Sequence, residues 1–178
     1  MVDLQFAHTA LLSPEVLAQT RAFLAGAFPE EFTNYDWENA IGGLHALLWE
    51  RAELIGHASV IQRRLLYGDL ALRAGYFECV GVRADRRLRG HGTKMMEALQ
   101  EQVRNTYDIS ALCSTSEAIP FYSKLGWRVW GGPLLTLTPS GLRNESRYRN
   151  RICILEHSLP LDLDAPLACD WRTGDPWE

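Results

Sequence analysis

The sequence lacks any apolar run approaching the ~20 residues that a membrane-spanning helix needs. Its first residues, MVDLQFAHTALLSPE, also lack the basic start and apolar core of a secretory signal peptide. Basic residues are outnumbered, with 18 Lys and Arg against 22 Asp and Glu, which argues against a general nucleic-acid binder with a basic face. We therefore expect neither a membrane nor a nucleic-acid partner, and the negative charge leaves room for a cationic ligand.

Cysteine is sparse and shows no CxxC spacing. The four cysteines stand inside apolar stretches, which predicts reduced thiols in a cytoplasmic protein and no structural metal site. The chain has 178 residues, 47% of them hydrophobic, which is enough for a sizeable core. A single domain over residues 1–178 is the expectation.

The predicted strands and helices follow a mixed order, as in an α/β (α+β) domain. Ser13-Pro14-Glu15 indicates a helix start, with serine as N-cap, proline at the first position and an acid in the first turn. Strand, helix and strand between residues 76 and 114 form a βαβ unit, which predicts adjacent parallel strands. We expect the loop 139–150 to be polar and the tail from about residue 159 to lie on the surface. The expected helices cover residues 13–27, 33–42, 94–107 and 117–125, and the expected strands 45–49, 54–66, 70–82, 109–114, 127–130, 134–138 and 151–157.

The stretch Gly75–Thr93 joins an apolar, β-prone half to a basic turn that leads into a helix. A helix N-terminus offers unpaired N–H groups and the positive end of the helix dipole, so the turn favours a phosphorylated cofactor. It has neither the GxGxxG of a dinucleotide fold nor the GxxxxGK[ST] of a P-loop. The residues that favour an anion are Arg86, Arg87, Arg89, Gly90 and Gly92.

Two motifs together resemble the GNAT (GCN5-related) acetyltransferase superfamily. The first is Arg87-x-x-Gly90-x-Gly92 between strand and helix, and the second is Phe121-Tyr122-x-Lys124-x-Gly126-Trp127 about thirty residues later. The resemblance implies a mixed, mostly antiparallel sheet with splayed central parallel strands, flanked by helices. It also implies acetyl-CoA as co-substrate, with its pyrophosphate held by the first motif.

Further segments resemble the aminoglycoside 2′-N-acetyltransferases over nearly the full length. That family transfers acetyl from acetyl-CoA to the 2′-amino group of aminoglycoside antibiotics, and its resemblance suggests a homodimer whose C-terminal tail, here about 159–178, contributes to the substrate pocket. The matching segments are Gly26-Ala27-Phe28, Asp36-Trp37-Glu38, Gly42 to Ala46, Val60 to Arg63, Gly75 to Glu78 and the ending from Cys169 to Trp177.

Glu78 and Tyr122 match the family's proton-transfer positions. A protonated amine cannot attack a thioester, so Glu78 is the candidate base, and partial burial would raise its pKa toward the useful range. Tyr122 is the candidate acid that protonates the departing thiolate. The plain alternatives are a solvent-facing strand carboxylate for Glu78 and a tyrosine that packs on the sheet for Tyr122.

The remaining site residues are implied by the same resemblance. Backbone groups of Val80 and Val82 would pair with the peptide-like pantetheine arm, and His91 is expected beside phosphates rather than as a base. His45 and His57 are expected to be structural. The turn residues implied to hold the pyrophosphate are Arg87, Leu88, Arg89, Gly90, His91, Gly92 and Thr93. The residues implied to meet the polycationic substrate are Glu31, Asp36, Glu78, Cys79, Cys113, Asp175 and Trp177.

Three departures from the family pattern bear on the substrate. Glu31 stands where the family commonly has Asp, the loop Arg143–Arg151 is basic where relatives carry acids, and Glu178 follows the usual terminal tryptophan. A basic loop over the pocket would repel a polycation, whereas Glu178 would supply a replacement carboxylate. Two other functions stay open: acetylation of another amine, such as a polyamine or a peptide N-terminus, and non-catalytic sensing of acyl-CoA.

Overall fold

The computed structural model describes residues 1–178, which divide into two compact units. Unit 1 contains residues 1–61 and 77–101, and unit 2 contains residues 62–76 and 102–178. The long strands β3 (Glu53–Tyr67) and β4 (Leu70–Val82) each contribute one part to either unit. None of the helices has the length and apolar composition that crossing a membrane requires.

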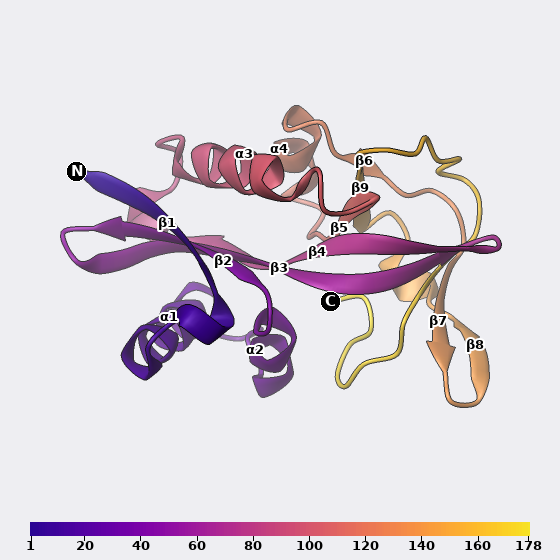
Figure 1. The fold of residues 1–178 in the computed structure, drawn as a ribbon, viewed down its shortest axis with the longest axis horizontal. Helices are drawn as coiled ribbons and strands as arrows, with labels where there is room; N and C mark the ends of the chain where they lie inside the picture. The colour runs from indigo at the N-terminus through magenta and orange to yellow at the C-terminus, as the bar shows by residue number, and fades with distance from the viewer. The chain divides into compact units, whose positions relative to one another are not determined.

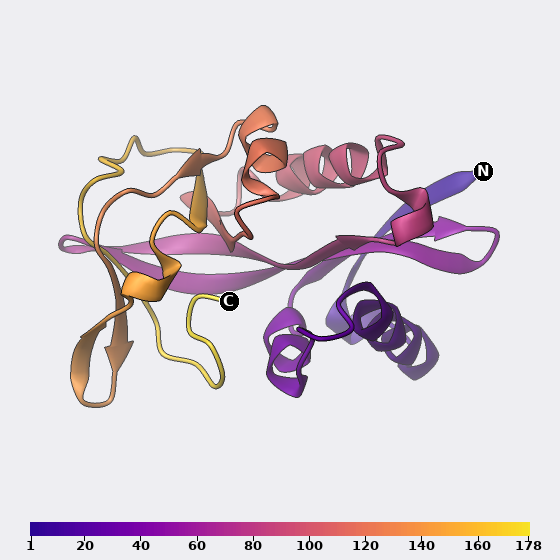
Figure 2. The same cartoon turned by 180° about the vertical axis from the view of Figure 1, so that it is seen from behind.

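Unit 1 is an antiparallel sheet with helices on both faces (Figures 1 and 2). β1 (Val2–His8) pairs antiparallel with β2 (Leu44–Glu50), which in turn pairs antiparallel with β3. After the 3-10 turn η1 (Thr9–Leu11), the helices α1 (Pro14–Ala27) and α2 (Asn34–Ala40) cover one face. A second 3-10 turn, η2 (Ala84–Arg86), leads to α3 (His91–Val103) on the opposite face.

The strands of unit 2 run in the order β6-β9-β5-β4-β3-β10-β7-β8. β4 and β5 pair in parallel through Ala74–Tyr76 and Ile109–Ala111, and β10 and β7 are also parallel. The pairs β3–β10, β5–β9, β6–β9 and β7–β8 are antiparallel. Its core contains Trp130, Tyr148 and Trp177, each at most 1% exposed. The elements not yet bounded are β5 (Ile109–Cys113), α4 (Ile119–Lys124), β6 (Arg128–Val129), β7 (Leu134–Thr138), β8 (Gly141–Asn144), η3 (Ser146–Tyr148), β9 (Ile152–Glu156) and β10 (Leu167–Cys169).

The structure confirms the mixed α/β class and the main order of elements. Ser13 accepts a hydrogen bond from the backbone N–H of Val16 and caps α1, with Pro14 at the first helical position. The hairpin β2–β3, the parallel pairing of β4 with β5 and the four reduced thiols are also as predicted. Gly126 follows α4 with φ of 90°, as expected of a residue that ends a helix.

Four local predictions were incomplete or wrong. The N-terminal strand β1 was missed, α3 ends at Val103 rather than near residue 107, and the polar loop contains β8. The tail does not simply lie on the surface. It adds the fully or nearly buried strand β10, and the Trp177 indole donates a hydrogen bond to the Leu135 carbonyl at 3.2 Å.

Candidate functional site

The turn before α3 presents a run of unpaired backbone N–H groups. Arg87 N–H donates to the Ala84 carbonyl at 3.3 Å and Lys94 N–H donates to the Gly90 carbonyl at 3.0 Å, but the amides from Leu88 to Thr93 have no backbone acceptor. Leu88 and Gly90 have positive φ values of 59° and 80°. A turn with such residues at a helix N-terminus displays successive N–H groups to an anion, so phosphate binding is the chemistry this backbone offers.

The three arginines of this turn differ in their contacts. The Arg87 guanidinium donates from Nε to the Val82 carbonyl at 2.9 Å, which fixes the turn to the end of β4. Arg86 is held by an ion pair with Glu50 at 2.7 Å, so its predicted contribution to an anion site is taken up within unit 1. Arg89 is exposed and has no acid partner, and it is therefore the arginine available to a phosphate.

β4 departs from regular strand geometry at Cys79. This residue has φ of 50°, a left-handed conformation that costs an L-residue roughly 1–2 kcal/mol. Two contacts hold it: His57 Nδ1 lies 3.0 Å from the Cys79 carbonyl oxygen, and the Cys79 thiol donates to the Asp36 carbonyl at 3.7 Å. The preceding residue, Glu78, is only 6% exposed, whereas Val80 is half-buried. Unit 1 thus brings Asp36 and Cys79 into contact, with the Glu78 carboxylate buried next to the distorted residue.

The two other predicted acids of unit 1 differ in their surroundings. Asp36 closes the cap of α2, since its Oδ2 accepts the Thr33 N–H at 2.6 Å while Thr33 Oγ1 accepts the Asp36 N–H at 3.3 Å. Glu31 is exposed in the segment between α1 and α2. Glu31 is therefore open to a cationic ligand, and Asp36 would have to bind one while it caps its helix.

In unit 2, Tyr122 lies on α4 and is 7% exposed. Its ring meets Trp127 edge-on, with centroids 6.2 Å apart. Burial, with smaller effects from Cys153 and Cys113, raises the pKa of Tyr122 above its usual value of 10. The phenol therefore stays protonated at neutral pH and can donate a proton. Cys113 is half-buried at the end of β5.

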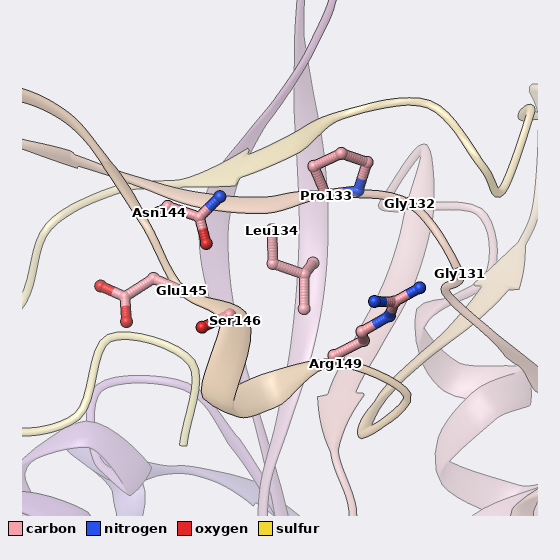
Figure 3. Close-up of a pocket in the computed structure, with 8 residues that line it drawn as sticks. All are labelled: Gly131, Gly132, Pro133, Leu134, Asn144, Glu145, Ser146 and Arg149. Atoms are coloured by element: carbon pink, nitrogen blue, oxygen red, sulfur yellow. The ribbon is translucent and has the colours of Figure 1, made fainter.

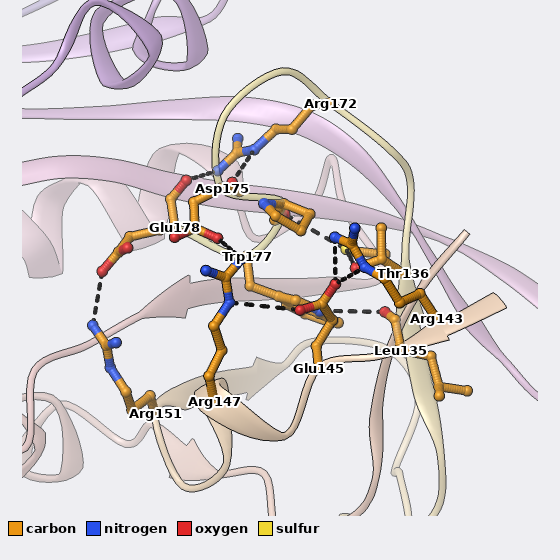
Figure 4. A network of polar contacts seen from close by, with 12 residues as sticks. Leu135, Thr136, Arg143, Glu145, Arg147, Arg151, Arg172, Asp175, Trp177 and Glu178 are labelled. Carbon is orange, nitrogen blue, oxygen red and sulfur yellow. Dashed lines mark hydrogen bonds and ion pairs between the residues drawn. The ribbon is translucent and has the colours of Figure 1, made fainter. Parts of the chain in front are cut away.

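The predicted tail residues Asp175 and Trp177 belong to a network of polar contacts in unit 2 (Figure 4). Arg147 pairs with both Asp175 and the buried Glu145, which also pairs with Arg143 at 2.7 Å. Burial and a hydrogen bond with Glu178 raise the pKa of Asp175 to about 6, against the opposing effect of Arg147. The basic loop is therefore largely neutralised by acids of the tail and of its own sequence.

The last two residues are fixed as well. The Trp177 indole is fully buried, and its backbone carbonyl accepts a hydrogen bond from the Tyr76 hydroxyl. Arg172 donates to a backbone oxygen of Glu178, and Arg151 pairs with the Glu178 side chain at 2.8 Å. Neither the burial of Trp177 nor the ion pair of Glu178 with Arg151 could be anticipated from the sequence, because Leu135 and Arg151 lie 42 and 27 residues away from their partners and no periodic pattern marks them.

A cavity of about 250 Å³ lies beside the β7–β8 hairpin in unit 2 (Figure 3). No residue predicted for the site lines it. The lining residues are Gly131, Gly132, Pro133, Leu134, Asn144, Glu145, Ser146 and Arg149.

Comparisons with known proteins agree on the family and the fold. The family described as "Acetyltransferase (GNAT) domain" matches residues 10–130. An aminoglycoside 2′-N-acetyltransferase from Mycolicibacterium fortuitum is 40% identical over 174 residues, which cover 96% of this chain and 89% of that protein. Its sequence similarity therefore extends well beyond the family domain and into the tail.

Solved structures with low sequence identity share the fold. Escherichia coli ElaA superposes with a TM-score of 0.63 at 17% identity, over 88% of this chain and 100% of its own. A GNAT family acetyltransferase from Brucella melitensis, solved in complex with acetyl-CoA, has a TM-score of 0.63 at 15% identity, over 96% of this chain and 97% of its own. At these identities the likeness concerns the fold alone.

Proposed function

The chain belongs to the GNAT acetyltransferase family, and on that premise we propose that it transfers the acetyl group of acetyl-CoA to the 2′-amino group of an aminoglycoside. The observation that carries the proposal is the 40% identity with an aminoglycoside 2′-N-acetyltransferase over nearly the whole length of both chains. The proposal includes a cytoplasmic location and a homodimer.

Acetyl-CoA is supported by the backbone of unit 1. The free amides from Leu88 to Thr93 and the unpaired Arg89 offer hydrogen bonds and positive charge to a pyrophosphate. Backbone groups of Val80 and Val82 would pair with the amides of the pantetheine arm. The Brucella melitensis protein of the same fold was solved with acetyl-CoA.

Glu78 and Tyr122 carry the proposed proton transfers. Glu78 accepts a proton from the attacking amine while the new N–C bond forms, directly or through a water molecule. Tyr122 gives a proton to the sulfur as the C–S bond breaks, and its raised pKa keeps that proton in place until then. Solvent then restores the protonation of both groups, so one acetyl group moves with no net change in the protein.

The substrate is a polycation, and the proposed contacts to it are carboxylates. Glu31, Asp36 and Asp175 supply negative charge, and Glu178 adds a further carboxylate. Glu78, Cys79, Cys113 and Trp177 complete the set that the resemblance implies, but the Trp177 indole is fully buried and donates to the Leu135 carbonyl, so its side chain does not meet the substrate. Three of the four arginines of the basic loop are paired with acids, because Arg143 and Arg147 face Glu145 while Arg151 faces Glu178. The loop therefore affects substrate binding mainly because its arginines pair with carboxylates that could otherwise bind the substrate. Repulsion between the arginines and the substrate amines is the smaller effect.

Arg147 competes with substrate amines for Asp175, which gives a test of this view. Replacing Arg147 by alanine should lower KM for the aminoglycoside about 1.4- to fivefold, as expected for a partly exposed ion pair worth ~0.2–1 kcal/mol. Steady-state kinetics of thiol release measure this KM at a pH well above 6, because the loss of Arg147 raises the pKa of Asp175 further and the carboxylate must stay ionised. The matched control is Arg143→Ala, since Arg143 pairs with Glu145 but not with the tail. An unchanged or higher KM in Arg147→Ala would show that Asp175 does not bind the substrate.

The proposed function itself is tested with a panel of amines and acetyl-CoA. We expect thiol release with aminoglycosides that carry a 2′-amine and none with analogues that carry a 2′-hydroxyl. Spermidine and a short peptide with a free N-terminus test the second enzymatic function. Tight binding of acetyl-CoA without turnover on any amine would instead favour the non-catalytic sensor and overturn the enzyme proposal.

A further inference from the structure

A row of hydrogen-bonded side chains crosses the interior of unit 1 and ends at the distorted residue of β4. Thr9 Oγ1 lies 2.7 Å from His45 Nε2, His45 Nδ1 lies 3.0 Å from His57 Nε2, and His57 Nδ1 lies 3.0 Å from the Cys79 carbonyl oxygen. Both histidines are 0% exposed. The proton transfers described above use neither of them.

The acceptor at one end of the row, the Cys79 carbonyl, and the donor at the other end, the Thr9 hydroxyl, together fix the direction of the bonds between them. A carbonyl oxygen only accepts, so His57 carries its hydrogen on Nδ1. In a neutral ring Nε2 is then bare and accepts from His45 Nδ1–H, which leaves His45 Nε2 to accept the Thr9 hydroxyl hydrogen. The Gly43 carbonyl, 3.2 Å from Thr9 Oγ1, is the other possible acceptor of that hydrogen, but the bare His45 Nε2 is closer at 2.7 Å, and the Thr9 oxygen in turn accepts the Gly42 N–H at 2.8 Å. All four ring nitrogens are satisfied with both histidines neutral and in the Nδ1–H tautomer.

The surroundings favour this neutral state. Burial lowers the pKa of His45 to about 4 and that of His57 to about 3. Both folded-state values lie below the ordinary value of 6.5, so the rings are uncharged at neutral pH and gain charge only in acid.

Cys79 needs such support because an L-residue does not adopt its φ of 50° without restraint. Its backbone angles set the direction of the chain on either side, which includes the Glu78 carboxylate and the backbone groups of Val80. A donor fixed on the Cys79 carbonyl therefore acts on both neighbours at once. The thiol contact with the Asp36 carbonyl, at 3.7 Å, is the longer of the two restraints.

We propose that His57 is a positioning residue for acetyl transfer: its Nδ1–H holds the Cys79 carbonyl, keeps β4 in its left-handed turn and so aims Glu78, while His45 and Thr9 fix the tautomer. The inference rests on the proposed function, because it assigns Glu78 as the base. The role of the buried histidine pair is to hold the geometry of β4. The pair does not carry protons, because the row ends at a backbone carbonyl, which does not relay them.

Kinetics of substituted proteins test the role of the bond to Cys79. His57→Leu removes the donor and should lower kcat about 10- to 100-fold, as expected when a reacting group is misplaced. The Kd of acetyl-CoA should rise by much less than kcat falls, because Val80 is only one of the proposed contacts to the cofactor and the amides from Leu88 to Thr93 do not depend on Cys79. His57→Asn keeps an N–H near the position of Nδ1 and should recover a large part of that loss. A folded His57→Leu protein with the kcat of the wild type, or no difference between the two variants, would overturn the proposal.

A second pair of variants works at the far end of the row, where substitution disturbs the core less. Thr9→Val removes the hydroxyl that fixes the His45 tautomer, and Thr9→Ser keeps it. We expect kcat to fall in Thr9→Val but not in Thr9→Ser. This comparison tests the positioning role of His57 even if His57→Leu does not fold. Equal kcat values in the two Thr9 variants would count against the proposal.

The tautomers are measured without any activity, by 15N–1H correlation spectroscopy of the imidazole rings in the wild-type protein. Both buried histidines should be neutral Nδ1–H tautomers at pH 7, and His45 should lose this preference in Thr9→Val. An Nε2–H tautomer or a charged ring at His57 would contradict the row of bonds even if the enzyme is active. Conversely, a protein with the expected tautomers but no turnover on any amine would refute the proposed function and leave the hydrogen-bond assignment intact.

Discussion

Replacing Glu78 with glutamine is expected to lower kcat about 10²- to 10⁴-fold, the usual contribution of a general base. Glutamine keeps the shape of the side chain, which matters because Glu78 is only 6% exposed, but its amide cannot take a proton from the amine. Acetyl-CoA should bind as before, since none of its proposed contacts, the backbone of Val80 and Val82, the amides from Leu88 to Thr93 and the Arg89 side chain, involves the Glu78 side chain. Thiol release measures the rate, and titration calorimetry measures cofactor binding.

The pH dependence separates a lost base from a disturbed site. In Glu78→Gln the residual rate should stay low over the whole pH range, because a higher pH cannot give glutamine a proton acceptor, and any limb of the wild-type kcat/KM profile that belongs to the base should be lost. Glu31→Gln is the matched control, because Glu31 is an exposed acid of the same unit and its loss should affect KM for the substrate rather than kcat. A Glu78→Gln enzyme with a kcat within about threefold of the wild type would show that another group is the base.

The strand, turn and helix around Gly75–Thr93 were predictable because each part carries its own local signal. β-prone residues precede the turn, glycine occurs where φ is positive at Gly90, and a helical pattern follows. The left-handed Cys79 was not predictable, since nothing in its neighbourhood marks it. Its conformation depends on His57, 22 residues earlier in the chain, and on Asp36, 43 residues earlier.

The same contrast explains the basic loop and the tail. A count of charges predicted repulsion between the loop and a polycation, but the effect of a charge depends on its partners, and these became visible only in three dimensions. Glu145 forms ion pairs with Arg143 and Arg147, and Asp175 pairs with Arg147, which is 28 residues away in the sequence. The strand β10 has three residues, which are too few to show the alternation of apolar and polar residues that predicts a strand. It is stabilised by pairing with β3 and β7. Resemblance to a family indicated that the tail matters, but not that its tryptophan is buried.

Replacing Tyr122 with phenylalanine should lower kcat about 10²- to 10⁴-fold if the phenol protonates the departing thiolate. Because burial raises the pKa of Tyr122, the hydroxyl of the wild type should remain protonated through pH 9, and no loss of activity below that pH should come from its ionisation. Thiol release over pH 6–9 measures both effects. Tyr148→Phe is the matched control: that tyrosine is also buried in unit 2, but its hydroxyl has no hydrogen-bond partner, so its removal breaks no bond.

The leaving group gives the sharper test of Tyr122. A reference cysteine thiol has a pKa of about 8.5, below the ordinary phenol value of about 10, so protonation of a thiolate by Tyr122 is uphill unless the site stabilises it. An acetyl thioester of a more acidic thiol needs less help to depart, and the defect of Tyr122→Phe should therefore shrink with such a donor, whereas the defect of Glu78→Gln should not. Equal defects with both donors would mean that Tyr122 positions the thioester rather than protonating sulfur.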